Sequence, residues 1–197
     1  ASSSLVASST TTIDWGTLAM NGANNINVGG NLEINGQGNY TSGTGTFTFD
    51  GPGTSTWTNE TTIDDLGIVV INGATKTVNL ASSSVQATKL TVEADDVFGL
   101  ASLGRVLTLT GSGADAARPL IVNGTLSEGT NSTVTFTGTS ASEIEAETYW
   151  HLTFTPAATV TYTLADTTSE TLSVLGDWTI GDAGSTVTAT ATANDPV

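Results

Sequence analysis

Residues 26–34 read Ile-Asn-Val-Gly-Gly-Asn-Leu-Glu-Ile, and the same pattern returns near the other end of the chain. Residues 172–180 read Leu-Ser-Val-Leu-Gly-Asp-Trp-Thr-Ile, with apolar, glycine and acid-or-amide positions in the same columns. Residues 120–126 form a third, looser copy. Within each copy apolar and polar side chains alternate, as in a strand with one buried face. Recurrence of such a unit along a chain indicates a repeat architecture.

A longer duplication overlies these copies, and the offset between its halves drifts only slightly along the chain. Its matching segments are 46–51 with 133–138, 63–68 with 149–154, and 77–81 with 161–165. We therefore divide the chain into four parts. These are an N-terminal arm or first strand (1–25), a first module (26–117), a second module (118–184) and a C-terminal strand (185–197).

Short runs that alternate threonine with apolar residues, separated by glycine-rich turns, predict an all-β chain. Strong helix formers are few, because Thr, Val, Ile and Gly interrupt every window. Repeated short strands with turns of variable length favour a right-handed parallel β-solenoid (β-helix) with an internal duplication. In that fold each coil buries alternate side chains and stacks on the next. A β-sandwich is the alternative, although its strands rarely share a sequence motif.

The composition excludes several classes of function. The chain has 197 residues, a net charge of −15 and no cysteine. Its four basic residues are scattered, so it has no basic stripe for nucleic acid or for an anionic membrane. No apolar run approaches the ~18 residues of a membrane-spanning helix. The chain opens with Ala-Ser-Ser-Ser, which is what cleavage at a small-residue site leaves, so we expect a mature secreted protein.

The order of the strand motifs resembles the β-solenoid repeats of large secreted cell-surface proteins of bacteria and archaea. The motifs that carry the resemblance are Thr133 to Gly138, Glu143-Ile144-Glu145, Tyr149 to Phe154, Thr161 to Leu164 and Leu172 to Ile180. The resemblance implies a parallel right-handed β-helix that serves as a stalk, an adhesin or a surface fibre, and it brings no catalytic residues. Such proteins are usually long, so a short solenoid would have to polymerise, which favours a fibre subunit.

The ends of the chain carry the candidate assembly residues. The run from Thr186 to Ala193 places threonine on one face and Val or Ala on the other, and neither lysine nor proline protects its edge. We expect it to add a strand to a neighbouring subunit, and the alternative is a final rung packed on its own chain. The predicted assembly residues are Leu5, Val6, Ile13, Thr186, Val187, Thr188, Ala189, Thr190, Ala191, Thr192 and Ala193.

Seven acidic residues are candidate cation ligands. Glu143, Glu145 and Glu147 alternate along the chain, so they would share one face of a strand, where like charges repel. Calcium prefers several oxygen ligands and is the one cofactor that would suit them. The sequence has no calcium-loop motif, so a solvated acidic face that confers solubility is the alternative. The candidates are Asp64, Asp65, Asp95, Asp96, Glu143, Glu145 and Glu147.

Four Asn-x-Ser/Thr sequons mark candidate N-glycosylation sites at Asn39, Asn59, Asn123 and Asn131. Unmodified turns are the alternative. Of the four tryptophans, Trp57 and Trp178 occupy apolar columns of the repeat and are expected in the core. Trp15 and Trp150 are less constrained and are the candidates for a sugar-binding platform.

Catalytic patterns are weak. His151 is the only histidine, and neither a Gly-x-Ser-x-Gly elbow nor a zinc ligand set accompanies it, so we expect a strand residue at an outward or aromatic-stacked position. Thr-x-Thr pairs at 46/48, 56/58, 75/77, 108/110 and 153/155 raise an ice-binding interpretation. Their irregular gaps argue against a match to a lattice.

The sequence therefore predicts a non-enzymatic, extracellular structural protein. Its subunits would join head to tail or by terminal strand addition into a filament or surface layer. The expected partners are copies of the same chain and, as an alternative, glycans. The first rival function is an adhesin or carbohydrate-binding surface module. The second is a polysaccharide-degrading enzyme, which the shortage of His, Lys and Arg disfavours.

Overall fold

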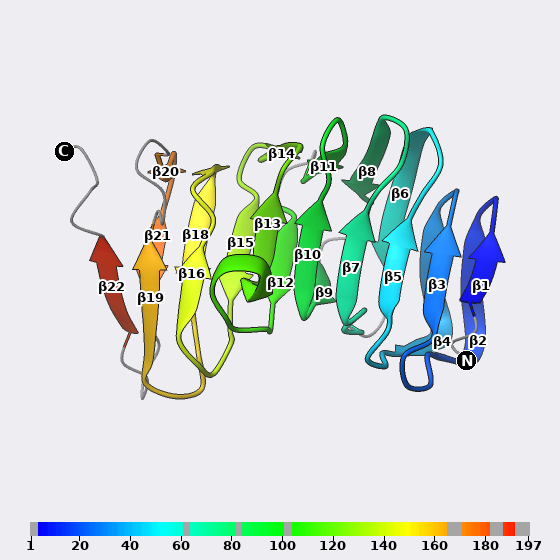
Figure 1. Ribbon diagram of the computed structural model, residues 1–197, viewed down its shortest axis with the longest axis horizontal. Helices are drawn as coiled ribbons and strands as arrows, with labels where there is room; N and C mark the ends of the chain where they lie inside the picture. Colours follow the sequence, from blue (N-terminus) through cyan, green and yellow to red (C-terminus); the bar gives the residue numbers. More distant parts are fainter. Residues whose placement is uncertain are drawn as a thin grey trace.

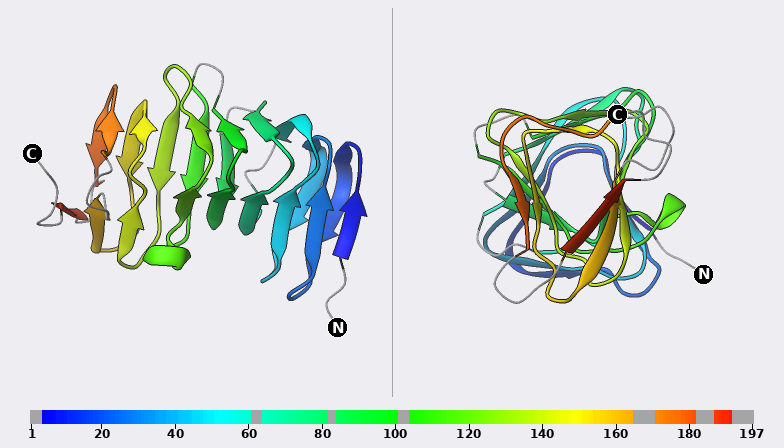
Figure 2. Two further views of the ribbon diagram at one scale, coloured as in Figure 1. Left: turned by 45° about the horizontal axis from the view of Figure 1, so that its top comes forward. Right: turned by 90° about the vertical axis from the view of Figure 1, so that its left-hand side faces the viewer.

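The computed structural model is a rod of stacked coils, about 7 turns long (Figures 1 and 2). The structure describes residues 4–60, 64–81, 84–100, 104–164 and 171–181, and the backbone of 187–191. Every strand pair within these ranges is parallel, and the first and last strands lie at opposite ends of the rod. The expected parallel β-solenoid is thereby confirmed in place of the sandwich.

Two six-stranded sheets form the first faces of the rod. Sheet A contains β1 (Ser4–Ala7), β3 (Asn25–Val28), β5 (Thr46–Phe49), β7 (Ile68–Ile71), β10 (Lys89–Val92) and β13 (Leu120–Val122). Sheet B contains β2 (Thr11–Ala19), β4 (Leu32–Thr41), β6 (Gly53–Asn59), β8 (Lys76–Leu80), β11 (Val97–Gly99) and β14 (Thr125–Ser127).

Three further sheets complete the later coils. Sheet C contains β9 (Ser84–Ala87), β12 (Val106–Leu109), β15 (Thr133–Phe136), β18 (His151–Phe154) and β21 (Trp178–Ile180). Sheet D contains β16 (Ser142–Ile144), β19 (Val160–Leu164) and β22 (Val187–Ala191), and it continues the line of sheet A in Figure 1. Sheet E contains β17 (Thr148–Tyr149) and β20 (Ser173–Val174).

The first coils are equal in length, since Ser4 pairs with Asn25 and Ile26 pairs with Phe47 at the same separation along the chain. Later coils vary in length. The coil that runs from Leu90 to its partner Leu120 is longer than the first coil by almost half. This longer coil carries the one helical turn of the described residues, η1 (Asp115–Ala117). No helix among these residues is long and apolar enough to cross a bilayer.

The segments matched in the long duplication occupy different faces, since 46–49 forms β5 of sheet A and 133–136 forms β15 of sheet C. The sheets run without a break across the expected module boundary at 117/118, because β10 pairs with β13 and β12 pairs with β15. The solenoid is therefore continuous over both modules.

Inward side chains stack in columns, with one member from each coil. One column of sheet A contains Leu5, Ile26, Phe47, Val69, Leu90 and Leu120, and all but Leu5 are buried. One column of sheet C contains Val85, Leu107, Val134, Leu152 and Trp178, and all but Trp178 are buried. Trp57 is buried between Leu32 and Leu80 in sheet B, which confirms its predicted core position.

All three tyrosines of the chain lie in this core. Burial raises the pKa of Tyr162 to about 12, and its hydroxyl donates to the carbonyl oxygen of Gly138. Burial raises the pKa of Tyr149 further, assisted by the charges of Glu145 and Glu147. Burial also raises the pKa of Tyr40, with a smaller contribution from Asp65. The folded protein therefore holds all three phenolic protons more tightly than the unfolded chain does.

We expect the free energy of unfolding to fall as the pH rises above 10. An unfolded tyrosine loses its proton near its ordinary pKa of about 10, whereas the folded tyrosines keep theirs, so alkali favours the unfolded chain. Phenolate absorbance and far-ultraviolet circular dichroism, followed together in an alkaline titration, should change in a single step. Phenolate absorbance that appears before the β-sheet signal is lost would contradict this coupling.

Candidate assembly surfaces at the two ends

The exposed large apolar side chains of the described residues lie at the two ends of the rod. Leu5, Val6 and Trp15 belong to the first coil, with exposed fractions of 48 %, 63 % and 75 %. Leu175, Trp178 and Ile180 belong to the last coil, with exposed fractions of 57 %, 41 % and 48 %. The coils between them expose no side chain of this kind among the described residues, so the apolar surface is confined to the ends.

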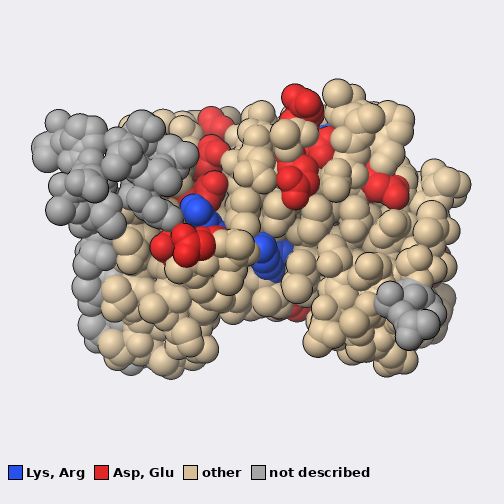
Figure 3. All heavy atoms as spheres, viewed as in Figure 1, with Lys and Arg blue, Asp and Glu red and all other residues tan. Residues whose placement is uncertain are grey.

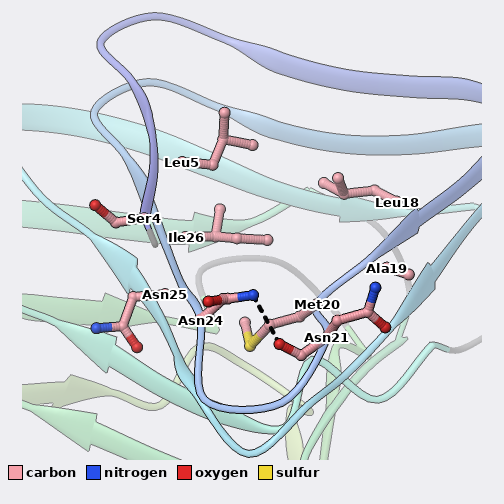
Figure 4. A pocket seen from close by; sticks show the side chains of 9 residues that line it. All are labelled: Ser4, Leu5, Leu18, Ala19, Met20, Asn21, Asn24, Asn25 and Ile26. Atoms are coloured by element: carbon pink, nitrogen blue, oxygen red, sulfur yellow. Dashed lines mark hydrogen bonds between the residues drawn. The ribbon is translucent and has the colours of Figure 1, made fainter. Parts of the chain in front are cut away.

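The N-terminal end is hollowed between β1 and β2. A cavity of about 290 Å³ is lined by nine residues, and Figure 4 shows Leu5, Leu18 and Ile26 around the same space. The amide nitrogen of Asn24 donates to the carbonyl oxygen of Asn21 over 2.8 Å beside it. A second hollow of about 360 Å³ shares Leu5 and Leu18 and extends to Trp15. These hollows are the uncovered end of the core.

A bulge in the pairing of β2 with β4 places Trp15 outside. The register shifts between Ile13 and Trp15, so that Ile13 lies opposite Ile34 and Trp15 lies opposite Gln37. Ile13 is 8 % exposed and belongs to the core, so of the predicted opposing arm only Leu5 and Val6 are exposed.

At the C-terminal end, Trp178 and Ile180 lie in register with Leu152 and Phe154. These partners are buried, so Trp178 and Ile180 are core positions that the described coils leave without a following rung. The Trp178 ring remains 6.2 Å from that of Phe154. Trp178 was expected in the core, and its place at the end of the column explains why it stays partly exposed.

The predicted assembly strand forms β22, whose backbone pairs in parallel with β19 of the same chain from Val187 to Ala191. This segment is therefore a rung on its own chain, the alternative to a donated strand. Of the other predicted assembly residues, Thr186, Thr192 and Ala193 lie outside the described part of the structure. In sheet D, β22 is the edge strand.

Asp96 secures a corner of the solenoid from inside. It is 1 % exposed, and its two carboxylate oxygens accept from the backbone nitrogens of Lys76 (2.6 Å) and Gly73 (2.9 Å). Lys76 is fully buried, and its Nζ donates to the carbonyl oxygen of Gly29 over 2.6 Å. Burial lowers the pKa of Lys76, and the charges of Asp50 and Asp96 oppose that shift. Asp95, next to this network, is exposed.

The other aspartate pair also binds protein donors. Asp65 accepts from the backbone nitrogen of Gly67 (2.7 Å) and from the hydroxyl of Thr110 (2.7 Å). Asp64 accepts from the backbone nitrogen of Tyr40 over 2.9 Å. These carboxylates therefore connect neighbouring coils.

Glu143 and Glu145 bridge the junction between sheet A and sheet D. Glu145 accepts from the Arg118 guanidinium over 2.7 Å and from the backbone nitrogen of Val122 over 3.2 Å. Glu143 accepts from the backbone nitrogen of Asp115 over 2.7 Å. Beside η1, these glutamate carboxylates thus take the place of backbone carbonyl groups as hydrogen-bond acceptors. Glu147 contributes its charge to the environment of Tyr149.

No group of three or more acidic or histidine side chains is arranged as a metal site in the described ranges. The seven cation candidates are instead distributed over separate corners of the rod.

The sequon asparagines differ in accessibility. Asn39, Asn123 and Asn131 are exposed, whereas Asn59 is 5 % exposed and lies in β6 opposite Ile34. In the folded protein the side chain of Asn59 is therefore inaccessible, whereas the other three are accessible. His151 is a strand residue whose Nδ1 accepts from the backbone nitrogen of Asp177 over 2.8 Å, and Trp150 beside it is half-buried.

The corner network of Lys76 and Asp96 could not be predicted from the sequence, because nothing in a local pattern marks a lysine as buried. Leu175, Trp178 and Ile180 were not predicted as end residues. A signal for Trp178 and Ile180 was present, since 172–180 is the last copy of the strand repeat and its inward residues have no later copy to cover them.

No protein-family model matches the chain, and neither a curated protein nor a solved structure is similar to it at a significant level. We therefore infer the function from the geometry of the chain itself.

We expect Asp96→Ala to lower the free energy of unfolding by about 3 kcal/mol, because two buried backbone N–H groups lose a charged acceptor. Lys76 also loses a nearby negative charge. Asp95→Asn is the matched control and should change stability little, since Asp95 is exposed and asparagine tolerates its positive φ of 67°. Urea denaturation of both variants measures the difference, and equal midpoints would refute the corner role.

Proposed function

We propose that this protein is a structural subunit that joins further copies of itself end to end, forming an extracellular filament or surface layer. One observation carries the proposal, namely that the six large apolar side chains exposed among the described residues all belong to the first and last coils. Large exposed apolar surface marks interaction sites in soluble proteins. Three of the six, Leu5, Trp178 and Ile180, continue buried inward columns at positions where the described strands provide no further rung.

Strand edges support the same contact. β1 and β2 are edge strands of sheets A and B, and β21 and β22 are edge strands of sheets C and D. An edge strand offers unpaired backbone N–H and C=O groups to another chain. When the C-terminal end of one copy meets the N-terminal end of the next, the strands of both run in the same direction. Such a heterologous contact leaves a free end at each side and so generates an open filament.

The free energies of apolar burial and of association are similar in size, so we expect assembly to depend on the salt concentration. Burying the exposed half of one such side chain contributes roughly 1 kcal/mol. Six of them therefore contribute about 6 kcal/mol, which lies in the low part of the estimated cost of association, about 4 to 15 kcal/mol. Backbone pairing must add to them, and repulsion between chains of charge −15 opposes them. Figure 3 shows charged side chains gathered over the central coils of one face. Salt should therefore favour assembly.

A second candidate function is a carbohydrate-binding surface module. The observation that favours it is Trp15, which is 75 % exposed and lies opposite Gln37 on the outer side of sheet B. An exposed aromatic ring beside an amide suits a sugar ring, which stacks its apolar face and hydrogen-bonds its hydroxyls. Loss of glycan-array binding on Trp15→Ala would support this candidate.

We expect the wild-type chain at neutral pH and about 0.15 M salt to form rods longer than a single subunit in electron micrographs. Leu5→Lys blocks the N-terminal end and Ile180→Lys blocks the C-terminal end, because a lysine at an uncovered core position cannot be buried without a partner. Each variant alone should sediment as a monomer. An equimolar mixture should form dimers and nothing longer, because each variant keeps one working end.

Thr48→Lys, at an outward position in the middle of sheet A, is the control and should still form rods. Dimers of Leu5→Lys or of Ile180→Lys alone would show head-to-head contacts and contradict the proposed polarity. Wild-type monomers at every concentration and salt tested would overturn the assembly function itself.

A further inference from the structure

The outward face of sheet C carries threonines in register. The pairing of β12, β15, β18 and β21 places Thr108, Thr135, Thr153 and Thr179 in one column. A second column lies two residues further along each strand. Its members, Thr110, Thr137 and Thr155, are placed by backbone hydrogen bonds to the preceding coil. Their backbone nitrogens donate to the carbonyl oxygens of Ala87, Leu109 and Phe136, respectively. The face is therefore an array of Thr-x-Thr pairs on adjacent coils.

This arrangement corrects the sequence argument against a periodic threonine surface. The gaps between Thr-x-Thr pairs along the chain are irregular, but loops of different length absorb them while the strands keep their register. Of the pairs considered from sequence, 108/110 and 153/155 meet on sheet C, with 135/137 between them. The pairs at 46/48 and 56/58 lie on sheets A and B.

The array is rigid. Adjacent rungs of a parallel sheet lie about 4.8 Å apart, and alternate residues of one strand lie about 6.6 Å apart. Threonine is β-branched, so few side-chain rotamers are open to it in a strand. The residues behind the array, such as Leu107, Val134 and Leu152, are fully packed in the core. At one rim, the hydroxyls of Thr88 and Thr110 are held by Asp65.

The chemistry of the face limits what it can bind. The described outward strand positions of sheet C hold no Asp, Glu, Lys or Arg, although the chain has a net charge of −15. Their one ionisable side chain is His151. The charged neighbours, Asp65 and Asp177, lie at the rims. The strands of the array present no outward Trp, Tyr or Phe within the described residues, so a sugar ring has no stacking platform on it. Between its outermost backbone positions the array measures about 14 Å by about 7 Å, an area of about 100 Å². A stable protein interface buries roughly 800 Å² on each partner, which is far more.

We propose that this threonine face binds ice. A crystal plane repeats in two dimensions as the face does, needs no charge, and extends beyond the edges of a small array. The oxygen repeat along one axis of hexagonal ice is close to the spacing of the rungs. Each threonine offers a hydroxyl oxygen that accepts a hydrogen bond from a lattice water and a methyl group that fits between waters. In the second column, Thr110 donates its own hydroxyl proton to Asp65, and Thr137 donates its proton to the carbonyl oxygen of Leu109. The small number of rungs makes slowed recrystallisation the expected activity.

The test measures ice recrystallisation and uptake into a slowly grown ice shell. The wild-type chain should slow recrystallisation and enter the shell, and Thr135→Lys should lose both properties because it places a long charged side chain at the centre of the array. Thr77→Lys is the matched control, a half-buried outward threonine in the middle of sheet B, and should behave as wild type. Thermal denaturation checks that both variants fold.

Thr135→Val keeps the shape and removes the hydroxyl, so it tests the face even if the lysine variant fails to fold, and it should weaken both properties. Exclusion of the wild-type chain from ice, or equal loss in the sheet B control, would overturn the proposal. Sedimentation with microcrystalline cellulose distinguishes the alternative ligand. Binding to cellulose that Thr135→Lys abolishes, without uptake into ice, would assign the face to a polysaccharide and refute the ice proposal.

Discussion

Parallel, in-register stacking of successive coils is the interaction on which the rest of the structure depends. It closes the backbone hydrogen bonds of every inner strand and places each inward side chain on the equivalent one of the coil before. The column from Leu5 to Leu120 and the column from Val85 to Trp178 are direct results. The same stacking forms the outward threonine columns of sheet C. Core, surface pattern and ends therefore share one origin.

Stacking also leaves some backbone N–H groups at the corners without a backbone acceptor, and polar side chains at the corners supply one. Where a coil turns between sheets, some backbone N–H groups donate to a side chain and not to the backbone of a neighbouring coil. Asp96 accepts from two backbone N–H groups at one corner, and Asp65 and Glu145 each accept from one at other corners. A chain with 19 acidic residues and four basic ones thus uses several of its carboxylates to complete its backbone bonding. The acidity that suggested a cation site has this structural use.

Much of the fold could be predicted from local pattern, because the alternation in 26–34 and its return in 172–180 depend only on neighbouring residues. The burial of Trp57 followed from the same columns. The faces could not be predicted, because similar strands such as β5 and β15 lie on different sheets and only the lengths of the intervening loops decide this. The corner role of Asp96 and the joining of Thr108, Thr135 and Thr153 were hidden for the same reason. Both depend on contacts between coils, which local sequence does not record.

The coil that carries η1 has a consequence for how such a rod tolerates change. Its path from Leu90 to Leu120 is much longer than that of the first coil from Ser4 to Asn25, yet β10 still pairs with β13 and β12 with β15. Extra chain is looped outward at a corner and tied down by Arg118 and Glu145. For protein engineering, this corner is a natural graft site, where a foreign peptide can be displayed beside the rod without altering the geometry of its faces.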